Sequence, residues 1–119
     1  MTVGMVRHRL QPHLADRSVE PIAGLTELAD AVLTLRTRNE ARRFLRDLCT
    51  LPELEALAHR WQIARLLDRG MPYIEIAERV PTSTATVTRV AQWLHHGTGG
   101  YRLVLERSRD ASRPRRSRG

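Results

Sequence analysis

Apolar residues at helical spacing form two short stripes on either side of a break between Met71 and Leu94. Between the stripes, Pro81 lacks a backbone N–H and keeps Val80 out of the α-helical region, so one helix cannot continue through this point. The pattern therefore predicts two short helices joined by a sharp turn, a helix-turn-helix, with the small Ala77 where the helices cross closely. The stripes consist of Tyr73, Ile76, Ala77 and Val80 in the first helix and Val87, Val90, Ala91 and Leu94 in the second.

Two amphipathic helices are predicted near the start of the folded part of the chain. The first spans residues 25–35 and the second spans residues 39–48. The second follows Thr37, which has Glu40 three residues later, the arrangement of a capping box.

A third, longer helix is predicted from the repeat of that arrangement at Thr50 and Glu53 up to Gly70, which suits the C-terminal cap. This helix is apolar on more than one side, and a helix of that kind is buried nearly all round. One short chain can hardly cover it, so we expect a second subunit to do so. The two apolar stripes are Leu54, Leu57, Ala58 and Trp61, and Ile63, Leu66 and Leu67.

The chain divides into three parts on composition. Residues 1–24 have no sustained period and are expected to be a flexible N-terminal extension. Residues 25–106 form the helical domain, in which the apolar segment 101–105 folds back after the glycine-rich break 97–100. Residues 107–119 are rich in Arg, Ser, Asp and Pro, so we expect a disordered tail.

The net charge of +7 lies mainly in the tail. Residues 25–101 carry ten Arg and nine acids, whereas residues 102–119 carry seven Arg and two acids. Such a tail can attach to nucleic acid by counterion release, but it carries no sequence information. No apolar run is long enough to span a bilayer and no secretory signal is apparent, so a cytoplasmic, nucleoid-associated protein without membrane contact is expected.

The outer face of the second helix of the motif carries donors and small residues but no acid. The free N–H groups and positive dipole end at its start favour a phosphate, and Arg89 and Gln92 can reach base edges or phosphates. The alternative is that Ser83 and Thr84 are an ordinary N-terminal cap and Arg89 a solvated charge. The candidate DNA-binding residues are Ser83, Thr84, Ala85, Thr86, Thr88, Arg89, Gln92 and His96.

The spacing of the candidate catalytic and metal-binding residues in the sequence does not predict a site. His95 and His96 are adjacent, so on a helix they diverge by about 100° and cannot share a metal. His59 is isolated, and the single Cys49 lies in an apolar run where it packs as a small hydrophobic residue. The sequence shows no catalytic nucleophile with a general base beside it and no glycine-rich loop that could bind a phosphate. We therefore interpret the chain as a non-enzyme without a metal or cofactor.

Three segments carry a resemblance to a known family: FLRDLCT (residues 44–50), STATVTRV (83–90) and GGYRL (99–103). In this order they resemble the YerC/YecD family of the tryptophan-repressor-like superfamily over about residues 25–107. The resemblance implies an intertwined all-helical homodimer whose two helix-turn-helix units read successive major grooves, and a transcriptional regulator. The family usually has glycine where Pro81 stands, so the turn must be built differently here.

The resemblance also bears on a small-molecule effector. In the tryptophan repressor itself the co-repressor is held by residues that align with Thr50, Arg60 and Arg89, and an arginine can bind a carboxylate bidentately. The bulky Val90 and Trp93, which stand where the repressor has small residues, could fill the indole pocket from within. An amino-acid co-repressor is therefore not expected, and the three residues stay candidates only.

These observations together predict a transcriptional regulator that binds a specific sequence of double-stranded DNA as a homodimer through residues 71–96. Of the two modes of regulation, repression is the one expected. The alternative is a helical protein-protein interaction module or adaptor with only non-specific affinity for nucleic acid. It would dock through the basic face of the second helix or through Trp93.

Overall fold

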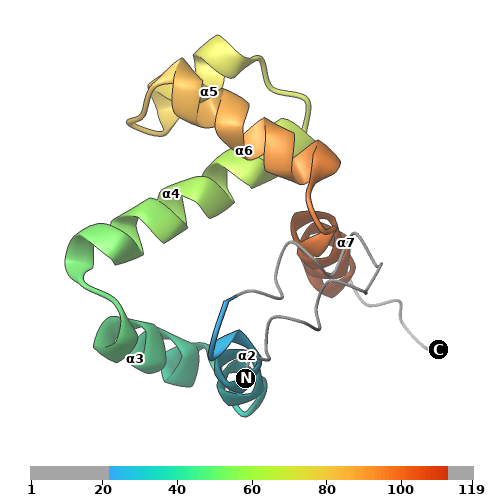
Figure 1. Ribbon diagram of the computed structural model, residues 1–119. Coiled ribbons are helices and arrows are strands. Elements are labelled where there is room, and N and C mark those ends of the chain that lie inside the picture. The colour runs from blue at the N-terminus through green and yellow to red at the C-terminus, as the bar shows by residue number, and fades with distance from the viewer. Residues whose placement is uncertain (1–21, 113–119) are drawn as a thin grey trace, which may run out of the picture. The chain divides into compact units, whose positions relative to one another are not determined.

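The computed structural model describes residues 22–112, which are helical apart from short connections (Figure 1). By its contacts the chain divides between Leu51 and Pro52 into two compact units. The predicted all-α fold is confirmed for the described range, and the predicted domain 25–106 includes parts of both units. The helices are α2 (Leu25–Leu33), α3 (Arg38–Leu48), α4 (Leu51–Asp68), α5 (Tyr73–Arg79), α6 (Thr84–His96) and α7 (Gly100–Ser112).

The first unit contains α2 and α3. Helix α2 ends at Leu33, short of the predicted residue 35, and the Thr34 hydroxyl donates to a carbonyl of its last turn at 2.7 Å. The predicted cap of α3 is confirmed, because the Thr37 hydroxyl accepts from the Glu40 N–H at 3.1 Å. The Glu40 carboxylate, however, accepts from the N–H of Arg36 at 2.8 Å instead of returning to Thr37. The predicted N-terminal extension, residues 1–24, lies almost wholly outside the described residues.

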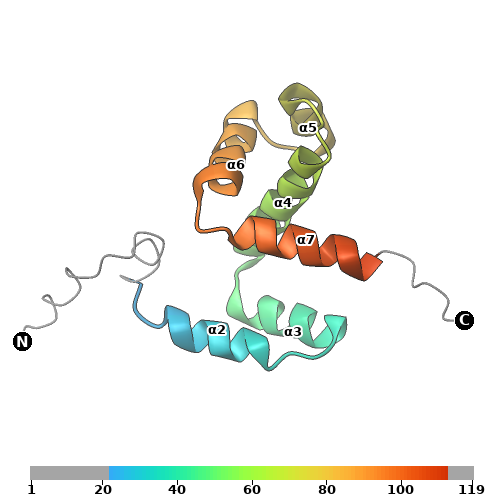
Figure 2. The same cartoon turned by 90° about the vertical axis from the view of Figure 1, so that its right-hand side faces the viewer.

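The second unit is built around the C-terminal half of α4, beside which α5 and α6 lie in both views (Figures 1 and 2). Each of these three helices contributes aliphatic side chains to one core cluster. Removing such side chains from water is the main term that holds the unit together. The buried members of the cluster are Ile63 and Ala64 of α4, Ile76 of α5 and Val80 directly after it, and Val87 and Val90 of α6.

A glycine at positive φ ends α4, as predicted. Gly70 has φ +83°, its N–H donates to the Leu67 carbonyl at 2.9 Å, and the Met71 N–H donates to the Leu66 carbonyl at 3.1 Å. This pair of bonds is the Schellman motif, which satisfies the last carbonyls of the helix. It turns the chain back so that α5 can pack against α4.

The C-terminal helix corrects one prediction from the sequence. Residues from 107 onward were expected to be disordered, but α7 continues to Ser112. Leu105 is buried, and Asp68 of α4 pairs with Arg102 at 3.6 Å and with Arg109. Composition alone does not reveal these contacts, because the partner carboxylate lies far away in the sequence. The rest of the predicted tail, residues 113–119, lies outside the described residues.

The N-terminal half of α4 is much less buried than its C-terminal half. Leu51 is 61% exposed and Leu57 is 41% exposed, whereas Ile63 and Ala64 are fully buried. The protomer therefore leaves uncovered part of the helix that the sequence shows to be apolar on more than one side. This arrangement agrees with a covering second subunit, which stays a prediction.

Candidate nucleic-acid interface

Helices α5 and α6 form the predicted helix-turn-helix. All four predicted inward residues of α6 are buried, and on α5 Ile76 and Val80 are buried while Ala77 packs against the core. The prediction was wrong for Tyr73, the first residue of α5, whose side chain is 43% exposed. The inner face of α6 is thus held firmly and its opposite face is left free.

The turn between the two helices is made by extended residues on either side of Pro81. Val80 has φ −105° and ψ 116°, and Ser83 has φ −97° and ψ 160°. The preceding position is extended because a proline ring crowds the α conformation of the residue before it. The Val80 N–H still donates to the Ile76 carbonyl at 2.8 Å and closes the last turn of α5. These flanking conformations build the turn without glycine.

The N-terminus of α6 is capped by Ser83. Its Oγ accepts from the Thr86 N–H at 3.2 Å and lies 3.2 Å from the Thr86 hydroxyl. The N–H groups of Thr84 and Ala85 have no intrahelical acceptor because they belong to the first turn. The cap therefore coexists with two free donors at the positive end of the helix, where an anion is favoured.

The predicted outer face of α6 is largely exposed. Arg89, Gln92 and His96 recur at i, i+3 and i+7, and Arg89 forms no ion pair within residues 22–112. The Thr88 hydroxyl donates to the Thr84 carbonyl at 3.0 Å, which leaves it only acceptor capacity toward a ligand. The exposed members of the predicted set are Ser83, Thr84, Ala85, Thr88, Arg89, Gln92 and His96, and Thr86 is half-buried.

A tryptophan near the end of α6 is exposed, whereas the sequence left open whether it fills a pocket or lies at the surface. Trp93 is 56% exposed, and the Gly97 N–H donates to its carbonyl at 2.9 Å. A Cβ at Gly97 would come within 2.5 Å of the Trp93 carbonyl oxygen and 3.0 Å of its ring. A glycine is therefore required at the helix end for steric reasons, and a break in the helical pattern was the only sign of it in the sequence.

The three residues aligned with a co-repressor site are all exposed. Arg60 and Arg89 belong to the second unit, and Thr50 belongs to the first. Arg60 lies close enough to Tyr101 of α7 to act on its titration: burial raises the pKa of the Tyr101 hydroxyl and the positive charge of Arg60 opposes that rise. The sequence did not indicate this neighbour of Arg60.

Two further features concern the described residues only. In residues 22–112 no group of three or more His, Cys, Asp or Glu side chains is placed to hold a metal ion. None of the helices in this range is both long enough and apolar enough to cross a membrane.

Comparison with known proteins gives consistent similarities. The sequence profile of the family "Trp repressor protein" matches residues 23–109. "Uncharacterized protein YerC" of Bacillus subtilis is 37% identical over 86 residues, which cover 72% of this chain and 83% of that protein. A "Trp operon repressor homolog" of Haemophilus influenzae is 44% identical over 52 residues, 43% of this chain and about half of that protein.

Solved structures show the same similarity. A putative Trp repressor from Staphylococcus aureus matches with a TM-score of 0.71 and 36% identity, over 82% of this chain and 96% of that one. A TrpR-like protein from Eubacterium eligens matches with a TM-score of 0.68 and 37% identity, over 73% of this chain and 90% of that one.

Proposed function

The chain belongs to the Trp repressor family of DNA-binding transcriptional regulators, and we propose that it represses transcription as a homodimer that reads a specific DNA sequence through α6. On this proposal it works in the cytoplasm, on the nucleoid. Its reading residues would be the exposed polar side chains of α6, and the N-terminus of that helix would meet a backbone phosphate.

The observation that carries the proposal is the geometry of α6. Its inner face is buried against α4 and α5, while Arg89 and Gln92 extend from the other face without an acid on the helix. A rigidly seated helix can present side chains to base edges in a fixed register. The excess charge of the tail supports only a general attraction to DNA.

Exposed apolar side chains support the homodimer. Four leucines are each more than 40% exposed: Leu33, Leu48 and Leu51 in the first unit and Leu57 in the second. A second copy of the chain would remove such surface from water. Two copies of α6 would then bind half-sites about one helical turn, roughly 34 Å, apart.

Selection of binding sites from a random duplex pool tests this function. The full chain at moderate salt should enrich a two-fold symmetric motif with half-sites about one helical turn apart. Arg89→Ala should lose the enrichment, whereas Arg38→Gln, which removes an exposed charge from α3, should keep it. If the wild-type chain enriches no motif, the proposal is wrong. Sedimentation equilibrium measures the dimer independently.

We further propose that no amino-acid co-repressor is needed. Val90, which follows Arg89, is only 2% exposed, so its side chain fills core space that a smaller residue would leave open. The affinity for the selected site should be the same with and without millimolar tryptophan. If tryptophan changed the affinity, this proposal would be wrong, and Thr50, Arg60 and Arg89 would be the candidate residues of an effector site.

The exposure of Trp93 favours one alternative, an adaptor that docks on another protein. Exposed tryptophans are common anchors of protein interfaces. If Trp93→Ala abolished capture of a protein partner and left DNA selection unchanged, docking would be a separate role. Docking without any sequence preference in DNA binding would replace the regulator proposal.

A further inference from the structure

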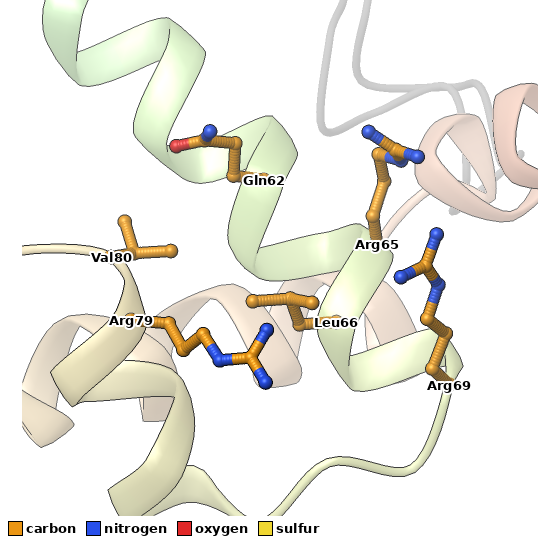
Figure 3. Close-up of a pocket in the computed structure, with 6 residues that line it drawn as sticks. All are labelled: Gln62, Arg65, Leu66, Arg69, Arg79 and Val80. Carbon is orange, nitrogen blue, oxygen red and sulfur yellow. The ribbon is translucent and has the colours of Figure 1, made fainter.

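A pocket of about 210 Å³ lies between the C-terminal half of α4 and the end of α5 (Figure 3). Its polar lining consists of three arginines and one amide, and its apolar lining of two aliphatic side chains. The α4 residues recur at i, i+3, i+4 and i+7 and therefore form one stripe of the helix. The lining residues are Gln62, Arg65, Leu66 and Arg69 of α4, Arg79 of α5, and Val80, the residue that follows α5.

The positive charges of this pocket are poorly compensated. Arg65 and Arg69 form no ion pair within residues 22–112. The neighbouring acid of α4, Asp68, is instead engaged by two arginines of α7. Arg79 pairs with Glu75 at 3.7 Å, but both side chains are about half exposed, so solvent screens this pair.

The three arginines border the pocket from two helices. Figure 3 shows Arg65 and Arg69 leaving the same side of α4 on successive turns. Arg79 reaches from α5 toward Leu66, and its guanidinium group lies across Leu66 from those of Arg65 and Arg69. Like charges at i and i+4 repel each other, so the free pocket is electrostatically unfavourable. An anion would relieve that repulsion, and a guanidinium group matches the geometry of a phosphate better than an ammonium does.

We propose that this pocket binds a phosphoryl group through Arg65, Arg69 and Arg79, with the Gln62 amide as a neutral donor. Leu66 and Val80 suit the carbon portion of a phosphate ester. The inference goes beyond DNA reading by α6, because no α6 residue lines the pocket.

Two sources could supply the phosphoryl group. One is a small phosphorylated molecule. The other is the DNA backbone, because Arg79 precedes the cap residue Ser83 by four residues and thus by at most roughly 14 Å of extended chain. The shared chemistry is tested first, and the source is decided afterwards.

Titration of the full chain with inorganic phosphate, at constant ionic strength and without DNA, tests the pocket. The guanidinium NMR signals of Arg65, Arg69 and Arg79 should shift and saturate together, whereas that of Arg38 should not. Replacing any one of the three by Gln should weaken phosphate binding roughly tenfold, the scale of a lost charge-assisted hydrogen bond. Arg38→Gln is the matched control, and far-UV circular dichroism verifies that each variant is folded.

The affinity of the same variants for duplex DNA distinguishes the sources. If Arg65→Gln and Arg79→Gln weaken phosphate binding but bind DNA like Arg38→Gln, the ligand is a small molecule. If they also weaken DNA binding beyond Arg38→Gln, the phosphoryl group is in the DNA backbone. The inference is overturned if all three pocket variants match Arg38→Gln in both measurements. Because Arg89→Ala should leave the phosphate titration unchanged, failure of DNA reading by α6 is a separate result.

Discussion

Asp68 near the end of α4 accepts a hydrogen bond from the guanidinium group of Arg109, forty-one residues further along the chain. The side chain of Asp68 is only 14% exposed and also pairs with Arg102. One carboxylate thus holds α7 at two positions that are seven residues, or about two helical turns, apart. The second position, Arg109, lies beyond the predicted end of the domain. The pairing explains why order continues to Ser112.

Replacing Asp68 by Asn should loosen the second half of α7. Two partly exposed ion pairs of this kind contribute about 0.2–1 kcal/mol each, so the loss of stability should be about 1 kcal/mol. Hydrogen exchange of amides 107–112 should become faster, and the control Glu106→Gln should leave it unchanged. Unchanged protection in Asp68→Asn would show that apolar contacts such as that of Leu105 hold the helix alone.

The stability of the helix-turn-helix should depend strongly on the Val87 side chain, which is fully buried in α6. Val87→Ala removes two methyl groups and leaves a cavity, so we expect a loss of about 2–3 kcal/mol in the free energy of unfolding. Val104→Ala makes the same change on α7, where Val104 is 48% exposed. Its loss in the free energy of unfolding should be much smaller than that of Val87→Ala. Urea unfolding of both variants measures the difference.

The two roles discussed for Ser83 can be separated by one substitution. Aspartate is as good a helix cap as serine, so Ser83→Asp should keep the stability of α6. Its carboxylate would, however, stand where a DNA phosphate is expected, so DNA affinity should fall. Ser83→Ala should instead lower stability by about 0.5–2 kcal/mol through loss of the cap. Unaltered DNA affinity in Ser83→Asp would mean that the serine is a cap alone.

Arg89 should contribute to specificity rather than to general attraction. Arg89→Ala should weaken binding to the selected site by about 1–3 kcal/mol if the side chain contacts a base, with little change on random DNA. Deleting residues 113–119, which contain four arginines, should lower affinity for all sequences and flatten its salt dependence. Quantitative gel shifts at two salt concentrations distinguish the effects, and equal losses on specific and random DNA would reduce Arg89 to a phosphate contact.

The titration of Tyr101 links stability to pH. Burial raises its pKa above the ordinary value of 10.0, so the folded state holds the phenolic proton more tightly than the unfolded state. That contribution is fully present below pH 10 and is lost as the pH rises through the folded pKa. Unfolding measured at pH 9 and pH 11 should show this loss in the wild-type chain and in Tyr73→Phe, but not in Tyr101→Phe.

The local signals of the sequence were sufficient for the helices and for the motif. The period of Val87, Val90, Ala91 and Leu94 identified the buried face of α6, and Pro81 and Gly70 marked the turn and the end of α4. These features follow from backbone chemistry and from residues within one or two turns of each other. The roles of the exposed α6 residues in DNA reading stay predictions.

Only the tertiary structure decided the features that join distant segments. Asp68 with Arg102 and Arg109, Arg60 near Tyr101, and the pocket shared by α4 and α5 each depend on how helices far apart in sequence pack together. The sequence by itself determined the helical periods, the acid-free face of α6 and the family resemblance, because each is written in neighbouring residues. Packing decided which charged side chains form ion pairs and which do not, since that depends on distances that no local pattern encodes.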